Sequence, residues 1–161
     1  MVKNNFVYIL LFILSLNTIS FSINKDHNKK ILDFQQTLAR AFINKDEKIF
    51  SKSILPSSVL EKVFTPDIIS KSGEGFYSKI TGFNQIRFKE WTEVLGNLKK
   101  HQWESEFVLG NKHSNTTVYS NNCLVYKNSY IILKYSNRIT IKIKIEELVL
   151  IQGEYFIIKL D

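Results

Sequence analysis

The chain has few of the residues that cross-link small domains or bind metal ions. Its 161 residues include one cysteine, three histidines and two prolines. A single cysteine cannot form an internal disulfide, so burial of apolar side chains has to stabilise the fold without covalent help. The sequence contains no H-x-x-x-H, C-x-x-C or D-x-D spacing, and we therefore expect neither a metal nor a cofactor. Cys123 stands in the strand-like stretch CLVY without a histidine nearby in sequence, which favours a half-buried thiol over a nucleophile.

Clustered positive charge is also missing. The formal net charge is +7 at pH 7, but the cations are scattered and no arginine-rich run occurs. Proteins that bind nucleic acid present a basic patch or stripe to the phosphates. We therefore expect no nucleic-acid partner, while an acidic protein partner or an anionic surface stays open as an alternative.

One long apolar segment occurs, and it lies at the N-terminus. Lys3 precedes the largely apolar residues 6–16. The small residues Ser20 and Ser22 occupy the positions that a signal peptidase recognises before its cleavage site. A spanning helix needs about 20 apolar residues. We therefore expect residues 1–22 to be a secretory signal cleaved after Ser22, with an uncleaved anchor as the alternative. Residues 23–161 would then form a single secreted or periplasmic domain without a membrane span.

Helical periodicity dominates the part of the chain that follows. Apolar residues recur at helical spacing over residues 27–46 and, after an Asn-Lys-Asp break, over residues 47–55. Pro56 ends the second helix, and a short helical piece over residues 59–64 ends before Pro66.

Two further segments complete this half. Residues 67–80 contain two glycines within a short polar stretch, which predicts a short hairpin. Residues 84–100 return to the helical period, with an apolar set of Ile86, Phe88, Trp91, Val94, Leu95 and Leu98.

From residue 102 onward the period changes to two, which is typical of strands. Alternating runs cover residues 102–109, 116–126, 130–135, 138–151 and 154–160, separated by short polar turns such as Lys-Asn-Ser and Gln-Gly. Helices first and strands last predict an α+β domain, with the helices packed on a curved antiparallel sheet of four to six strands, like a cone.

The order of these elements resembles the nuclear transport factor 2-like superfamily of cystatin-like α+β cones. The matching stretches are LARAFINKDEKIFSKSIL, DIISKSGEGFYSKITGFNQIRFKEWTEVL and IEELVLIQGEYFIIKLD, and the similarity of pattern spans residues 31–161. The resemblance implies a conical pocket between sheet and helices, often a homodimer through the outer sheet face, and no particular activity. Some members are steroid isomerases or dehydratases with a tyrosine–aspartate or aspartate–histidine pair. No acidic residue or histidine of this chain clearly matches those positions.

Candidates for catalysis are few. Asp33 lies at the start of the first helix, His101 lies at a helix-to-strand junction, and Glu147 follows a series of isoleucines in strand phase. A general base needs a partner or substrate within hydrogen-bond reach, and the sequence pairs none of the three with a second polar group. We therefore favour a protein without catalytic activity.

Candidate binding residues fall into two sets. The aromatic residues expected near the mouth of a cone, with core packing as the alternative, are Trp91, Trp103, Phe76, Tyr77 and Phe83. The second set is a basic stripe along one strand face, roughly 20 Å long, formed by Arg138, Thr140, Lys142 and Lys144. This stripe is either a solvated face paired with Glu104 and Glu106 or a surface that recognises an acidic partner.

These observations favour an exported, non-catalytic binding domain for a small apolar ligand or a protein partner. One alternative is a periplasmic inhibitor or immunity-type protein that neutralises a toxin or an enzyme. Another is a small pocket enzyme of the isomerase or dehydratase type, which would use Glu147 or Asp33 with a tyrosine.

The stretch RITIKIKIEELVLIQG bears on that last alternative. Isoleucines at every second position from Ile139 to Ile145 share one phase, and Glu147 continues it, whereas Leu148 and Leu150 take the opposite phase. We favour a β-bulge at the two adjacent glutamates that switches the phase and leaves both at the kink. Without a bulge, Glu147 would point into the core and would need a partner there.

Overall fold

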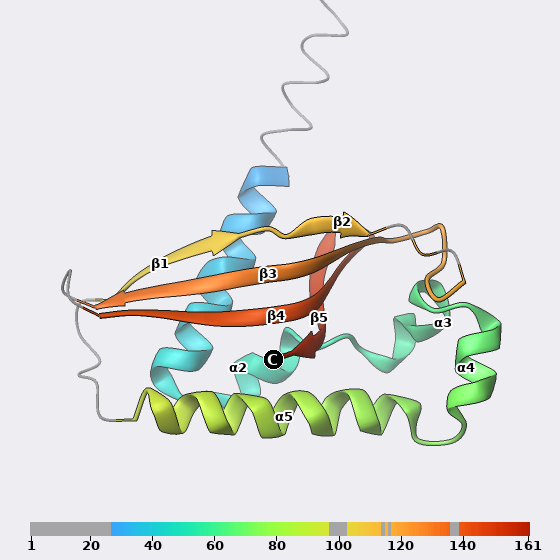
Figure 1. Cartoon of the computed structure of the whole chain (residues 1–161), viewed down its shortest axis with the longest axis horizontal. Coiled ribbons are helices and arrows are strands. Elements are labelled where there is room, and N and C mark those ends of the chain that lie inside the picture. Colours follow the sequence, from blue (N-terminus) through green and yellow to red (C-terminus); the bar gives the residue numbers. More distant parts are fainter. Residues whose placement is uncertain (1–26, 97–102, 114, 116, 136–138) are drawn as a thin grey trace, which may run out of the picture.

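The computed structural model describes residues 27–96, 103–113, 115, 117–135 and 139–161, in which five helices precede a five-stranded antiparallel sheet (Figure 1). The helical elements are residues 27–44, α2 (Glu47–Lys52), the short 3-10 helix η1 (Ser57–Val59), α3 (Leu60–Val63), α4 (Pro66–Ser72) and α5 (Phe76–Val94). The strands are β1 (Trp103–Val108), β2 (Asn111–His113), β3 (Leu124–Tyr135), β4 (Ile139–Ile151) and β5 (Glu154–Leu160). The predicted α+β class and the helices-first order are confirmed.

The sequence predicts a secretory signal and no membrane span in the domain that follows it. The expected signal over residues 1–22 lies outside the described residues. Among the residues that the structure describes, no helix is long and apolar enough to cross a bilayer.

The sheet is an antiparallel meander in the order β1-β3-β4-β5, and β2 also pairs with β3. Trp103 pairs with Tyr135 and Asn111 pairs with Lys127, which is the same register. β1 and β2 are therefore two halves of one edge strand that is interrupted at residues 109–110.

One face of the sheet carries the core. Ile131, Leu133, Ile143 and Ile145 are fully buried, whereas Lys134 and Lys142, which take the opposite phase on the same two strands, are exposed. The helices cover the buried face, and α5 runs along the sheet below β4 in Figure 1. Between the helices, the rings of Phe50 and Phe88 stack with centroids 4.2 Å apart, and Phe42 packs beside both. Because this stack ties α2 to α5, the helical layer is held together by aromatic burial.

The sheet bends where its strands depart from regular geometry. Asn128, in the middle of β3, has φ 60°, and the β4–β5 register shifts on both sides of Glu147. At the same level Gly110 approaches β3 so closely that a Cβ there would collide with the carbonyl oxygen of Lys127. Bulges increase strand twist and bending, and Figure 1 shows β5 running steeply across the direction of β3 and β4.

Gly110→Ala is therefore expected to destabilise the fold by about 1–3 kcal/mol, because backbone has to move to admit the methyl group. Gly82→Ala is the matched control, since Gly82 lies inside α5 and open space surrounds the position that its methyl group would take. Alanine there should stabilise by about 0.5–1 kcal/mol. Urea unfolding of both variants checks the pair, and equal stabilities would contradict the close approach at Gly110.

The predicted hairpin over residues 67–80 is wrong, because this segment is helical. Pro66 occupies the first turn of α4, where its missing N–H costs nothing. The two glycines do adopt positive φ, 70° at Gly73 and 83° at Gly75, but they join α4 to α5 rather than two strands. The glycine signal for a turn is correct, and the type of the flanking elements is not.

The turn predicted at Lys-Asn-Ser is also wrong. β3 continues through it because Asn128 adopts the left-handed conformation that asparagine tolerates, without leaving the sheet. The polar segment over residues 110–115, one of the turns expected between the alternating runs, contains β2. The Gln-Gly turn is confirmed, with φ 52° at Gln152 and 80° at Gly153, as a tight two-residue hairpin requires.

The buried face of α5 agrees with the predicted one only in part, since Phe88 and Leu95 of the predicted set are buried. Ile86 and Val94 are 60% and 64% exposed, and the helix begins at Phe76 rather than near residue 84. The inward residues recur every four positions: Ile80, Asn84, Phe88 and Thr92. Two of these four are polar, so a pattern based on apolar residues finds Phe88 but misses Asn84 and Thr92.

Candidate functional site

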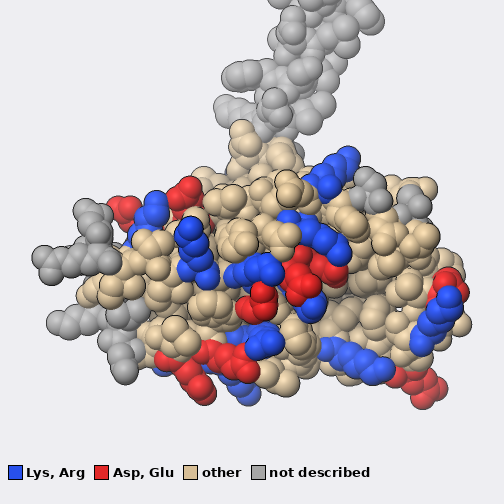
Figure 2. Space-filling model, in the orientation of Figure 1, with Lys and Arg blue, Asp and Glu red and all other residues tan. Residues whose placement is uncertain are grey.

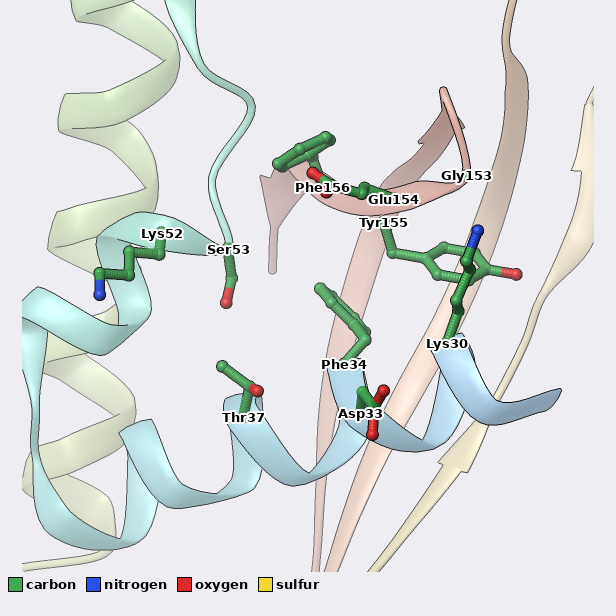
Figure 3. A pocket seen from close by; sticks show the side chains of 10 residues that line it. All are labelled: Lys30, Asp33, Phe34, Thr37, Lys52, Ser53, Gly153, Glu154, Tyr155 and Phe156. Atoms are coloured by element: carbon green, nitrogen blue, oxygen red, sulfur yellow. The ribbon is translucent and has the colours of Figure 1, made fainter. Parts of the chain in front are cut away.

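A cleft of about 340 Å³ lies between the first helix, the end of α2 and the β4–β5 turn (Figure 3). Its lining residues are Lys30, Asp33, Phe34, Thr37, Lys52, Ser53, Gly153, Glu154, Tyr155 and Phe156. They come from three segments that are far apart in the sequence.

Backbone pairing fixes the α2 side of the cleft. The N–H of Ile157 donates to the carbonyl oxygen of Ser53 at 2.7 Å, and the N–H of Leu55 donates to the carbonyl oxygen of Ile157 at 3.0 Å. The segment after α2 therefore lies along β5 like a short extra strand. Ser53 is held beside the sheet by these bonds.

Aromatic contacts fix the opposite side. The ring of Phe34, on the first helix, lies 5.6 Å from that of Phe107 and 5.8 Å from that of Tyr155, centroid to centroid. The Tyr155 hydroxyl points away from the cleft (Figure 3) and lies 3.3 Å from Nε2 of His27. Burial raises the pKa of Tyr155 well above its usual range. Tyr155 therefore presents a neutral ring to the cleft.

The innermost polar group of the cleft is the hydroxyl of Ser53. Ser53 is only 4% exposed, and Figure 3 shows its hydroxyl pointing into the cleft. The described part of the chain gives this hydroxyl no hydrogen-bond partner, and it leaves no fully enclosed side-chain nitrogen or oxygen unpaired. The Ser53 oxygen is therefore open to the cleft and available to a ligand.

The charges around the cleft are unevenly neutralised. Asp33 and Glu154 form no ion pair with any described residue. Lys30 lies across the β4–β5 turn, so that a Cβ on Gly153 would come 2.5 Å from its Nζ. The ammonium group of Lys52 is directed away from the centre of the cleft (Figure 3).

A second hollow, of about 200 Å³, lies beside β2 and the start of β3. Cys123 lines it with His113 and Tyr119, and its thiol is directed at the carbonyl oxygens of Val63 and Ser120. Burial raises the pKa of the Cys123 thiol, and the predicted half-buried thiol is confirmed. Nowhere in the described ranges do three potential metal ligands gather.

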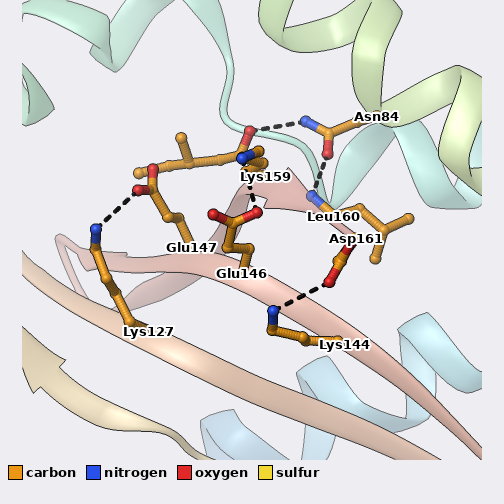
Figure 4. Close-up of polar contacts among 9 residues, drawn as sticks. Asn84, Lys127, Lys144, Glu146, Glu147, Lys159, Leu160 and Asp161 are labelled. Atoms are coloured by element: carbon orange, nitrogen blue, oxygen red, sulfur yellow. Dashed lines mark hydrogen bonds and ion pairs between the residues drawn. The ribbon is translucent and has the colours of Figure 1, made fainter.

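Glu147 lies at the bend of the sheet and not in the cleft (Figure 4). The β4–β5 register shifts on both sides of it, at the place of the predicted bulge, but the β3–β4 register continues unchanged through Glu147, so the predicted switch of phase does not occur. Its side chain is 18% exposed and lies 3.2 Å from Nζ of Lys127, while Glu146 lies 2.7 Å from Nζ of Lys159. Burial raises the pKa of Tyr119, and the negative charge of Glu147 raises it further.

Beyond Glu147 both faces of β4 carry buried residues, because Val149 and Ile151 keep the phase of Ile143 and Ile145. Leu148 and Val149 are adjacent in sequence and both fully buried. Glu147 is thus neither an isolated buried base nor a fully solvated residue, because it is largely buried and pairs with Lys127.

Of the two lysines in the expected basic stripe, Lys144 pairs with an acid and Lys142 forms no ion pair with a described residue, while Lys134 on the neighbouring strand β3 pairs with Glu106. Lys144 lies 3.0 Å from the Asp161 carboxylate, and Lys134 lies 2.9 Å from that of Glu106. The hydrogen bond from Lys134 lowers the pKa of Glu106, and the charge of Lys142 contributes to the same shift. Figure 2 shows both signs of charge interspersed over this face. Arg138 lies outside the described residues, and recognition of an acidic partner by this stripe stays a prediction.

The predicted aromatic set is dispersed over the fold. The Trp91 indole N–H donates to the carbonyl oxygen of Asp161 at 2.6 Å. The ring of Trp103 packs on Tyr135, and the ring of Phe76 packs edge-on against Phe64. Tyr77 and Phe83 are each 36% exposed on α5, and the Arg87 guanidinium lies 5.3 Å from the Phe83 ring centroid.

The cleft therefore contains few of the residues singled out in the sequence. None of the five aromatic candidates lines it, and Asp33 does. His101 lies outside the described residues.

Comparison of the chain with models of protein families, with curated proteins and with solved structures gave no match.

Proposed function

We propose that the protein is a non-catalytic binding domain that holds a small amphipathic molecule in the cleft of Figure 3. The observation that carries the proposal is the Ser53 hydroxyl, which is almost fully buried, points into the cleft and has no partner in the described part. A concave site with aromatic walls and a few convergent polar groups is the usual form of a small-molecule site.

The lining favours an amphipathic ligand over a purely apolar one. Phe34 and Phe156 supply apolar walls, while Ser53, Asp33 and Glu154 supply polar groups. A purely apolar molecule would cover the Ser53 hydroxyl without replacing its hydrogen bond to water, which costs about 1–3 kcal/mol.

The enzyme alternative draws less support from the same geometry. Catalysis of the isomerase or dehydratase type needs a carboxylate or histidine and a second polar group at one pocket. The Glu147–Tyr119 pair lies apart from the cleft, and Asp33 is exposed at its rim.

Export, and membership of the nuclear transport factor 2-like cones, belong to the proposal. The sequence of residues 1–22 supports export, and the order of helices and strands supports membership of the superfamily.

Amide shift mapping by NMR with a library of small amphipathic fragments tests the site. We expect fragments to perturb Phe34, Ser53 and Gly153, and Thr37→Trp to weaken their binding at least tenfold by filling the cleft. Gln36→Trp is the matched control, since Gln36 is exposed on the same helix but does not line the cleft. Fragments that bind elsewhere, or that bind Thr37→Trp as well as the parent chain, would overturn the proposed site.

A further inference from the structure

The charges and rings of the cleft narrow the class of ligand, an inference that rests on the proposed function. We propose that the cleft binds a small organic cation, with a primary ammonium group near Ser53 and Glu154 and an apolar body against the aromatic walls. An ammonium group has three N–H donors and no acceptor. It therefore needs acceptors in the site.

The cleft supplies such acceptors. The Ser53 hydroxyl oxygen has a free lone pair, because the described residues donate no hydrogen bond to it. Glu154 and Asp33 line the same cleft without an ion pair in the described part. The carboxylates of Glu146, Glu147 and Asp161, in contrast, are each matched by a lysine. Among the described residues, Asp33 and Glu154 thus lack the lysine partner that those three carboxylates have.

The two lysines of the lining do not oppose a cation at that position. The Lys52 ammonium group is directed away from the cleft, and Lys30 lies on the far side from Ser53, over Gly153 and Tyr155 (Figure 3). A ligand carboxylate near Ser53 would instead meet Glu154. Like charges at such a site disfavour binding.

The walls suit a cation as well as its apolar body. Phe34, Tyr155 and Phe156 present three aromatic rings to one cleft. Aromatic faces attract cations through their quadrupole, most strongly where water is excluded. Rings and carboxylates together therefore favour an ammonium ligand over a neutral one of the same shape.

Three probes that share a phenyl ring test the head group: phenethylamine, phenethyl alcohol and hydrocinnamate, titrated into the full chain and followed by NMR amide shifts. We expect the amine to bind at least tenfold more tightly than the alcohol, and hydrocinnamate to bind most weakly. Added salt should weaken the amine and leave the alcohol unchanged.

Substitution of single carboxylates tests which of them gives the cleft its preference for the amine. Glu154→Gln should weaken binding of the amine much more than binding of the alcohol, and so remove most of the amine's advantage. Glu146→Gln is the control, because Glu146 pairs with Lys159 outside the cleft. Glu154 is exposed, so its substitution leaves the core intact.

The possible results separate this inference from the proposed function. Equal binding of amine and alcohol, both lost in Thr37→Trp, would overturn the ammonium class and keep the binding site. Preference for hydrocinnamate would also overturn it. If none of the three probes binds the cleft while other fragments do, the ligand class is wrong; if no fragment binds there, the proposed function fails with it.

Discussion

Asn84→Leu is expected to reduce the free energy of unfolding by about 3–5 kcal/mol, a large share of the roughly 5–15 kcal/mol that stabilises a typical domain. Asn84 is fully buried in α5. Its side-chain amide donates to the carbonyl oxygens of Ile80 and Ile158, both at 2.9 Å, and its Oδ1 accepts from the N–H of Leu160 at 2.7 Å (Figure 4). The amide thus satisfies β5 as a neighbouring strand would. Leucine has a similar size but leaves a buried carbonyl and a buried N–H of β5 unpaired.

Two further variants isolate this effect in urea unfolding. Asn84→Asp keeps the acceptor for Leu160 but loses both donors and buries a charge, so we expect it to be at least as destabilising as leucine. Gln85→Leu makes the same amide-to-leucine change at the next, exposed position of α5 and should shift stability by about 0.5 kcal/mol or less. A loss below about 1 kcal/mol in Asn84→Leu would show that the amide does not hold β5.

Asn84 also shows where reasoning from the sequence reaches its limit. The strands can be predicted from alternation, because β4 has a buried face and a solvated face and its isoleucines recur at every second position. The place of the bulge at Glu147 is predicted from the two-sided apolar pattern that begins there, although the expected switch of phase does not occur. The face of α5, however, is decided by a buried asparagine, and its partners lie 74 and 76 positions away in the sequence. Local periodicity carries no information on such a contact.

The cleft is still less accessible to reasoning from the sequence. The Gln-Gly turn and the first helix are both predicted, but their proximity depends on how the sheet bends. Ser53 gives no signal, since a serine after a helix is ordinarily a solvated cap. It becomes the innermost polar group because the backbone of Ser53 and Leu55 bonds to Ile157. Asp33 is predicted only because it is the acidic residue near the start of the first helix.

Stability is expected to fall steeply above about pH 10, the range in which an unfolded tyrosine ionises. Burial raises the pKa of Tyr119, Tyr155 and Tyr126 in the folded protein. Above pH 10 the unfolded chain therefore loses protons that the folded chain keeps, and the free energy of unfolding decreases with rising pH. The stabilisation that the three buried, neutral tyrosines contribute is fully present below about pH 10. Tyr119 and Tyr155, which have the largest shifts, together cost about 3 kcal/mol for each further pH unit.

Urea midpoints measured through this range, with phenolate absorbance to follow ionisation, check the sign and the size. Tyr119→Phe and Tyr155→Phe should each remove about 1.4 kcal/mol per pH unit from the slope, whatever they do to stability at neutral pH. Tyr77→Phe removes the same hydroxyl from the surface of α5 and should keep the parent slope. Glu147→Gln should keep most of the Tyr119 contribution, because burial is the largest cause of that shift and the charge of Glu147 comes after it. A slope that Tyr119→Phe leaves unchanged would contradict the burial of the Tyr119 hydroxyl beside Glu147 at the bend of the sheet.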